Sequence, residues 1–326
     1  MRLALVLSLL CAALFIGSLV TGAVPVTAGQ SLLALIRDDG TPLSVVMREI
    51  RLPRALLGMM VGGSLGLAGA AMQGYLRNPL AEPGLIGVSA AAGLGAVLAL
   101  QTGAALWFAL ALPTAALASA LVAVALILTL AGPRGSSLTL ILAGIAISAL
   151  ASALTSLVLN LSPNPFAAAD IVFWMLGSLA DRSLSHVWIA LPFMVVGWAL
   201  LGALGRGLDA LTLGEDAAQA MGVALPRVRL ALVVGTAASV GAATAVAGAI
   251  GFVGLVVPHV LRPFVGGRPS RLLWASALGG AAMVLAADIA VRVLLPERDL
   301  KLGVLMALVG APLFLHLIYK TRGEMR

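Results

Sequence analysis

Long apolar runs dominate the chain, and polar residues gather in short stretches between them. Ten runs are long and apolar enough to be membrane-crossing helices, since about 20 apolar residues cover the hydrocarbon core. The expected spans are residues 3–24, 55–76, 84–101, 104–131, 138–161, 187–204, 228–247, 250–265, 272–294 and 303–319. The pattern therefore predicts an all-α polytopic membrane protein with about ten transmembrane helices.

Two further segments are not expected to cross the membrane. Residues 166–179 are too short for a span and follow two closely spaced prolines, so we predict a short helix at the outer, periplasmic surface. Residues 209–223 are amphipathic and carry acidic side chains, which is typical of a helix on the cytoplasmic face. Because no extended stretch lacks a long apolar run, residues 1–326 are expected to form a single transmembrane domain.

The basic residues distinguish the two membrane faces. Ten spans place both termini on one side, which then holds 12 of the 20 Lys and Arg residues and 5 of the 13 Asp and Glu residues. That side carries a net charge of +7 and the opposite side carries none. Because loops rich in Lys and Arg remain in the cytoplasm, we predict that the N-terminus and the C-terminus both face inward.

A short internal repeat divides the chain into two halves. The tripeptide LPR opens the second span at 52–54 and the seventh span at 225–227, and a Val-Gly pair follows both at the same offset. An odd number of spans separates the two copies, so the halves have opposite orientation. The sequence therefore predicts an inverted repeat of spans 2–5 and 7–10, a pattern typical of transporters.

Composition and motifs narrow the function classes. The chain is 61% hydrophobic and 10% charged, whereas soluble domains are about 25% charged. The net charge of +7 does not indicate nucleic-acid binding, because the basic residues form no stripe with interleaved aromatics. The sequence contains no G-x-x-x-x-G-K-[ST] loop, no zinc-type histidine spacing and no G-x-S-x-G motif. We therefore expect no catalytic residue, metal or cofactor in this chain.

Small residues follow one face of the second span. Gly58, Gly62, Gly66 and Gly69 recur at intervals of three or four residues. This spacing either lets a neighbouring helix approach closely or leaves a bare helix face along a transport path. The sequence alone does not choose between the two interpretations.

Two charged residues lie within the ninth span, where charge is costly and often functional. Asp288 and Arg292 are one helical turn apart, so their side chains are predicted to pair. A proton relay through Asp288 is the less favoured interpretation, because the aspartate has a cationic neighbour.

Several longer stretches resemble one family. They are RLPR at 51–54, RNPLAEPGLIGVS at 77–89, GEDA at 214–217 with MGV at 221–223, GFVGLVVPH at 251–259, and a segment from AD at 287–288 to GAP at 310–312. In order and content they resemble FecCD-type permease subunits of bacterial ABC importers for iron chelates and vitamin B12. The resemblance runs from about residue 45 to the C-terminus.

The resemblance implies a multi-pass protein of the bacterial inner membrane that works as a homodimer, with the transport path between its two copies. It also implies two ATP-binding-cassette ATPase subunits, which would bind ATP and Mg, and a periplasmic substrate-binding protein. Membrane lipid is the remaining expected partner, and nucleic acid is not.

Three groups of site residues follow from the matched motifs. Coupling to the ATPase is implied for Gly214, Glu215, Asp216 and Ala217 in the cytoplasmic coupling segment. Docking of the binding protein is implied for Arg51, Arg54 and Arg292. A cytoplasmic gate is implied for Asn78, Leu80, Ser136, Ser137 and Leu138.

The sequence indicates the substrate less clearly than it indicates the family. The stretch WMLGSL at 174–179 resembles iron-chelate permeases more than B12 permeases, so a ferric siderophore or haem is favoured and cobalamin stays open. His259 invites a role as haem ligand, but the Pro-His pair resembles a general family feature and favours a structural role. Two rival classes are a proton-coupled secondary transporter and a membrane scaffold.

Overall fold

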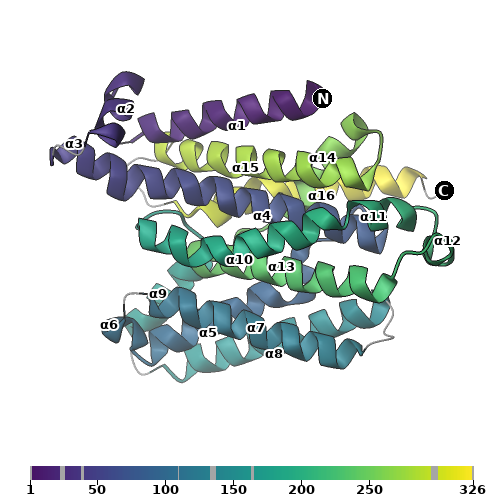
Figure 1. Ribbon diagram of the computed structural model, residues 1–326. Helices are drawn as coiled ribbons and strands as arrows, with labels where there is room; N and C mark the ends of the chain where they lie inside the picture. Colours follow the sequence, from purple (N-terminus) through teal and green to yellow (C-terminus); the bar gives the residue numbers. More distant parts are fainter. Residues whose placement is uncertain are drawn as a thin grey trace.

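The computed structural model describes residues 2–22, 26–37, 40–108, 110–132, 137–162, 165–294 and 300–324, and the regular structure of these residues is entirely helical. Figure 1 shows a bundle of roughly aligned long helices with short helices at both ends. The elements are α1 (Arg2–Val20), α2 (Ala28–Ile36), α3 (Pro42–Val45), η1 (Val46–Arg51), α4 (Leu52–Leu76), η2 (Pro83–Ile86), α5 (Val88–Gln101), α6 (Ala104–Trp107), α7 (Ala111–Ala131), α8 (Ser137–Asn160), α9 (Pro165–Met175), α10 (Leu184–Ala203), α11 (Gly205–Leu211), α12 (Glu215–Ala220), α13 (Leu225–Ala247), α14 (Val253–Leu261), η3 (Arg262–Val265), α15 (Pro269–Leu294) and α16 (Leu302–Glu324).

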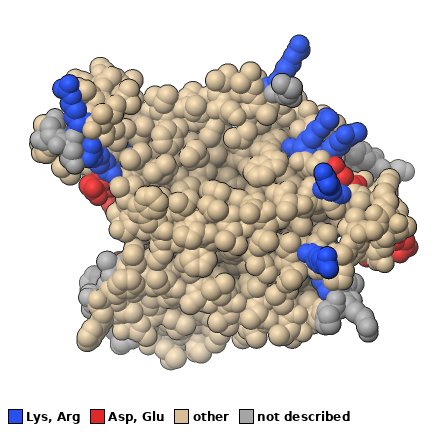
Figure 2. Space-filling model, in the orientation of Figure 1, with Lys and Arg blue, Asp and Glu red and all other residues tan. Residues whose placement is uncertain are grey.

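The predicted all-α membrane class is confirmed. Within the described residues, seven segments are long and apolar enough to cross a bilayer, and three further apolar helices are shorter. The shorter ones are Val88–Gln101, Val253–Val265 and Leu302–His316. On the face drawn in Figure 2, Lys, Arg, Asp and Glu lie at the two ends and the band between them is uncharged. A total of ten spans and the inward orientation of both termini stay predictions.

The glycine face of α4 serves close helix packing. Gly62 and Gly66 lie against the backbone of α15 at Gly280 and Ser276, and Gly69 lies against Gly254 of α14. A Cβ atom at any of these three α4 positions would overlap a backbone carbonyl oxygen. Small residues therefore bring the backbones into contact, and α4 becomes the buried centre of the bundle (Figure 1).

The packing partners repeat between the two halves. Under the predicted repeat, α4 corresponds to α13, α5 to α14 and α7 to α15. In the structure α4 packs on α14 and α15, while α13 packs on α5 and α7. The first helix of each half therefore packs on the second and third helices of the other half, and the inverted orientation of the halves stays a prediction.

The two short helices at the repeat interface begin later than predicted. The span predicted for 84–101 consists of η2 and then α5, because Gly87 has a left-handed φ of 78°. The span predicted for 250–265 consists of α14 and η3, because Phe252 adopts a φ of 67° directly before α14. A left-handed residue breaks the helical hydrogen-bond ladder, and apolar content alone does not reveal it.

The span predicted for 104–131 is also interrupted. Its first turn is the separate helix α6, after which Phe108 is extended with φ −148° and ψ 119°. The long helix α7 then starts at Ala111, with Pro113 in its first turn. Proline fits the first turn, where its missing N–H is not needed, but not a helix interior.

The two non-spanning segments are short helices. The segment predicted for 166–179 contains α9, which ends at Met175. The segment 209–223 is divided between α11 and α12, with Gly214 at a φ of 107° between them. In Figure 1, α9 lies at one end of the bundle with α2, α3 and α6, and α12 lies at the opposite end.

Candidate functional site

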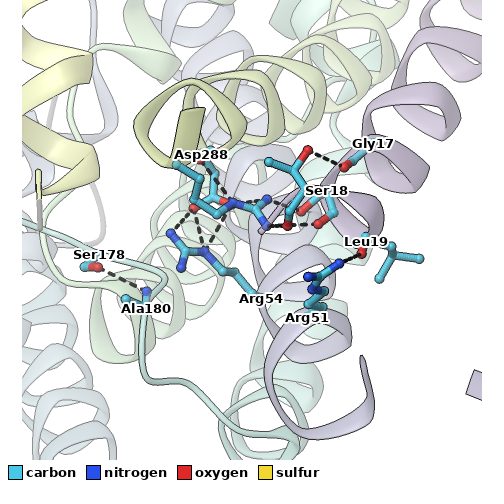
Figure 3. Close-up of polar contacts among 10 residues, drawn as sticks. Gly17, Ser18, Leu19, Arg51, Arg54, Ser178, Ala180 and Asp288 are labelled. Carbon is cyan, nitrogen blue, oxygen red and sulfur yellow. Dashed lines mark hydrogen bonds and ion pairs between the residues drawn. The ribbon is translucent and has the colours of Figure 1, made fainter. Parts of the chain in front are cut away.

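A cluster of ion pairs lies where the first turn of α4 meets the last turns of α15. Arg54 Nε donates to both Asp288 carboxylate oxygens, at 2.9 and 3.2 Å, and Arg54 Nη2 lies 2.9 Å from Oδ1. Arg292 Nη2 lies 2.8 Å from Asp288 Oδ2, which confirms the predicted pairing one turn apart. Figure 3 shows Arg54 and Asp288 pointing toward one another. The aspartate is 1% exposed, so both arginines neutralise a buried charge.

Arg292 also holds the end of α1. Its Nη1 donates to the carbonyl oxygens of Ser18 and Thr21 at 2.9 and 2.8 Å, and its Nη2 donates to Ser18 Oγ at 2.6 Å. Arg51 Nη1 donates to the carbonyls of Leu19 and Val20 at 3.0 and 2.9 Å, and Figure 3 shows the first of these bonds. The last carbonyls of a helix lack partners within that helix. Two arginines supply donors to four consecutive carbonyls here.

The structure thus brings together the three arginines predicted for docking, but they differ in how much of each is exposed. Arg51 is 4% exposed as a residue. The side chains of Arg54 and Arg292 are 18% and 12% exposed. Residue spacing reveals the Asp288–Arg292 pair. It does not reveal Arg54 as the second partner of Asp288, because 234 residues separate the two.

A second polar contact lies deep in the bundle, where loops from opposite ends meet. Glu82, in the loop between α4 and α5, accepts a hydrogen bond from the backbone N–H of Phe252 at 3.3 Å. Pro83 lies against Gly254, which also faces the carbonyl of Leu65 near the middle of α4. Broken helices at such a depth are tolerated where they are buried in protein or line a cavity. The sequence pattern does not single out Glu82 as a functional residue, although Glu82 lies within the motif at 77–89.

The predicted coupling residues lie in and directly before α12, at the end of the bundle opposite to the arginine cluster. Glu215 and Asp216 form the first turn of α12 and are exposed, while Gly214 and Ala217 are half-buried. Ser137 Oγ, at the start of α8, donates to Glu215 Oε1 at 3.3 Å. The structure therefore connects a predicted coupling residue with a predicted gate residue.

The predicted gate residues divide between two neighbouring segments. Asn78 Oδ1 accepts a hydrogen bond from the N–H of Leu80 at 2.9 Å, which closes a tight turn after α4. Ser137 and Leu138 lie in the first turn of α8. Ser136 lies outside the described residues. The two segments and α12 thus converge at one end of the bundle.

Asp209 fastens α11 to the start of α15. Its Oδ1 accepts from the N–H of Ser270 at 2.8 Å, and its Oδ2 accepts from Ser270 Oγ at 2.6 Å. A carboxylate at a helix N-terminus satisfies an unpaired N–H and favours the helix dipole.

Replacing Asp209 with alanine is expected to cost about 1–2 kcal/mol of stability, since it removes this cap. The thermal unfolding midpoint of the purified protein in detergent measures the effect. Asp216→Ala is the control, because Asp216 is exposed and makes no hydrogen bond or ion pair with any described residue. Equal midpoints for both variants would show that the Asp209 cap does not stabilise the protein.

His259 lies on α14 and is half-buried. No group of three or more His, Cys, Asp or Glu residues within the described ranges is arranged to hold a metal ion.

Comparison with known proteins finds relatives among membrane transport permeases. A model of the FecCD transport family matches residues 9–320. The Fe(3+) dicitrate transport system permease FecD of Escherichia coli is 39% identical, over 85% of this chain and 86% of its own length. The cobalamin import system permease BtuC of Halobacterium salinarum is 38% identical, over 92% and 80%.

A solved structure has the same fold. It is described as an inward-facing conformation of an ABC transporter assigned to the metal-chelate type. Its sequence is 32% identical, the TM-score is 0.87, and the match covers 98% of this chain and 99% of the other.

Proposed function

The chain belongs to the FecCD transport family, and we propose that it imports an iron chelate, a ferric siderophore or haem, delivered by a periplasmic binding protein. The family match over residues 9–320 carries the coarser conclusion that it is a permease subunit of an ABC importer in the inner membrane. The finer choice of an iron chelate draws on the resemblance of residues 174–179 to iron-chelate permeases.

The proposed assembly contains two copies of this chain, two ATPase subunits and one binding protein, with ten spans per copy and both termini in the cytoplasm. Exposed apolar side chains on the long helices, α8 and α16 among them, can contact either lipid or a second copy. Examples are Leu142, Ile145 and Leu157 on α8, and Leu308 and Leu315 on α16, each at least 50% exposed. ATP and Mg belong to the ATPase subunits, so this chain performs no chemistry on its cargo.

The proposed mechanism is alternating access. The loaded binding protein docks at the outer end near Arg54 and releases its cargo into the path between the two copies. Closure of the ATPases around ATP then displaces α12. The bond between Glu215 and Ser137 supports the step by which this displacement reaches α8 and the gate. The membrane helices rock, and the cargo leaves on the cytoplasmic side.

Cobalamin is the second candidate substrate, because a relative 38% identical over 92% of this chain is a cobalamin import permease. The deciding experiment reconstitutes the permease with its ATPase and binding protein in liposomes and measures ATP-driven uptake. Radiolabelled ferric siderophore, haem and cobalamin are the three probes.

Uptake of an iron chelate without uptake of cobalamin supports the proposal, and the reverse result overturns the choice of substrate. The same liposomes test the rival mechanism of a secondary transporter. If the purified chain without an ATPase accumulated cargo on a proton gradient, the importer proposal itself would be wrong.

A further inference from the structure

Exposed arginines gather where the start of α15 meets α11, at the end of the bundle that holds α12. Arg268 directly precedes α15, Arg271 lies in its first turn, and Arg206 lies in the first turn of α11. All three are exposed, and their side chains make no hydrogen bond or ion pair with any described residue. Gly205 packs against Ser270, which places Arg206 beside the start of α15. Figure 2 shows basic side chains grouped at this end.

An exposed tryptophan lies next to these arginines. Arg268, Arg271 and Trp274 recur at intervals of three residues, so they follow one strip of α15. Trp274 is 55% exposed and lies one turn closer to the uncharged band of Figure 2 than Arg271 does. A Cβ atom at Gly202 of α10 would overlap the Trp274 ring, so the ring packs on α10 and is held in place. The strip therefore presents charge at the helix end and an aromatic ring one turn deeper.

The same elements supply little negative charge. Asp209 is the acidic residue of α11, and both of its carboxylate oxygens accept hydrogen bonds from Ser270. The first turn of α15 contains no acidic residue. Cations at a helix N-terminus are opposed by the helix dipole. An anion supplied from outside the chain would offset this repulsion and bind the unused guanidinium donors.

We infer that Arg206, Arg268, Arg271 and Trp274 form a binding surface for anionic phospholipid, the α15 basic patch. Guanidinium groups bind phosphate with paired N–H donors, and clustered basic residues beside a membrane helix attract anionic headgroups. Tryptophan is enriched at the boundary between headgroups and acyl chains. The patch thus matches the phosphate and the acyl boundary of one lipid molecule in their order of depth. The inference goes beyond the proposed function and does not rest on the choice of cargo.

An acidic surface of the ATPase is the rival anion. The surface predicted to meet the ATPase is α12, whose exposed residues Glu215 and Asp216 carry the opposite charge to the patch. α12 packs on α11 and α13. A soluble protein partner accounts for the exposed arginines but not for the depth of Trp274, whereas a phospholipid accounts for both.

The fluorescence of Trp274 provides the test. The full chain is reconstituted in bilayers of phosphatidylcholine and phosphatidylglycerol in equal amounts, in which one lipid or the other carries brominated chains that quench tryptophan. The difference from the Trp274→Phe variant isolates Trp274 from the other four tryptophans. Phosphatidylglycerol should be preferred about tenfold beside Trp274. High salt should reduce this preference, because salt screens exposed charges.

Arginine variants show whether the patch causes the preference. Arg271→Gln should reduce it about fivefold. Arg227→Gln is the matched control, because Arg227 is exposed at the start of α13 and its side chain has no partner among the described residues. It removes the same charge away from the patch, so the preference should change by less than about twofold. Equal effects of the two variants would overturn the inference, since the charge of the whole chain would then explain the preference.

Two further outcomes would overturn it. One is equal quenching of Trp274 by the two brominated lipids. The other is a loss of quenching by both lipids when the ATPase is added, because the patch would then be a protein contact. If Trp274→Phe does not fold, Trp274→Tyr replaces it in the subtraction. Neither result depends on uptake of a cargo, so the inference and the proposed function fail separately.

Discussion

Replacing Gly66 with leucine is expected to prevent the accumulation of folded protein. Gly66 lies where the backbones of α4 and α15 touch, and a Cβ atom there would overlap the carbonyl oxygen of Ser276. Overpacking a core costs about 1–3 kcal/mol and occasionally more. The helix backbones have little room to separate, because α10, α13 and α14 also pack on α4. We therefore expect a loss of about 3 kcal/mol or more, measured as the yield of a monodisperse peak in size-exclusion chromatography.

Gly93→Leu is the control for this variant. Gly93 lies in α5, also within an apolar helix, but no atom lies within 4 Å of a Cβ atom built there. Its yield should stay near that of the unmodified protein. If both leucine variants gave the same yield, the close approach of α4 and α15 would not be needed for folding.

Replacing Glu215 with arginine is expected to reduce ATP-driven uptake by more than about tenfold. Glu215 begins α12, where a negative charge favours the helix dipole and a positive charge opposes it. The change also replaces the acceptor of the hydrogen bond from Ser137 and reverses the charge on the surface offered to the ATPase. Uptake and ATP hydrolysis are measured in the same liposomes, because lost coupling lowers uptake per ATP hydrolysed.

Glu324→Arg makes the same charge change near the C-terminus and should leave uptake per ATP unchanged. Glu215→Gln keeps an oxygen that Ser137 can bond but removes the charge, so its effect should be intermediate. Undiminished uptake in Glu215→Arg would contradict the coupling role of α12, provided that the variant is folded and assembled with its ATPase.

Local spacing along the sequence predicts much of this molecule. The apolar runs predict the membrane class, and the recurrence of Gly58, Gly62 and Gly66 predicts a small-residue face on α4. The four-residue interval between Asp288 and Arg292 predicts their ion pair, which the structure confirms. Each of these features depends on residues within a few turns of one helix.

Features that depend on distant residues or on single backbone angles are not predicted. Its position near the start of a predicted span gives Arg54 no evident partner. Only the tertiary fold places it against Asp288. The left-handed φ of Phe252 shortens α14, and this residue type rarely adopts that conformation. Glu82 acquires its partner only because loops from opposite ends of the bundle meet. The docking, coupling and gate roles were carried by the family resemblance and stay predictions.

The hydrogen bonds that hold the end of α1 form at different stages of protein synthesis. Arg51 lies close in sequence to the carbonyls of Leu19 and Val20 that it holds, but the carbonyls of Ser18 and Thr21 accept from Arg292, which is separated from Ser18 by 274 residues. At about 5–20 residues per second, ribosomes need roughly 15–55 s to synthesise that length. Until α15 is synthesised, the end of α1 can therefore have only part of its final set of hydrogen bonds, those from Arg51. Truncations that stop before α15 should therefore leave the end of α1 less firmly held than in the whole protein and more open to membrane quality-control proteases.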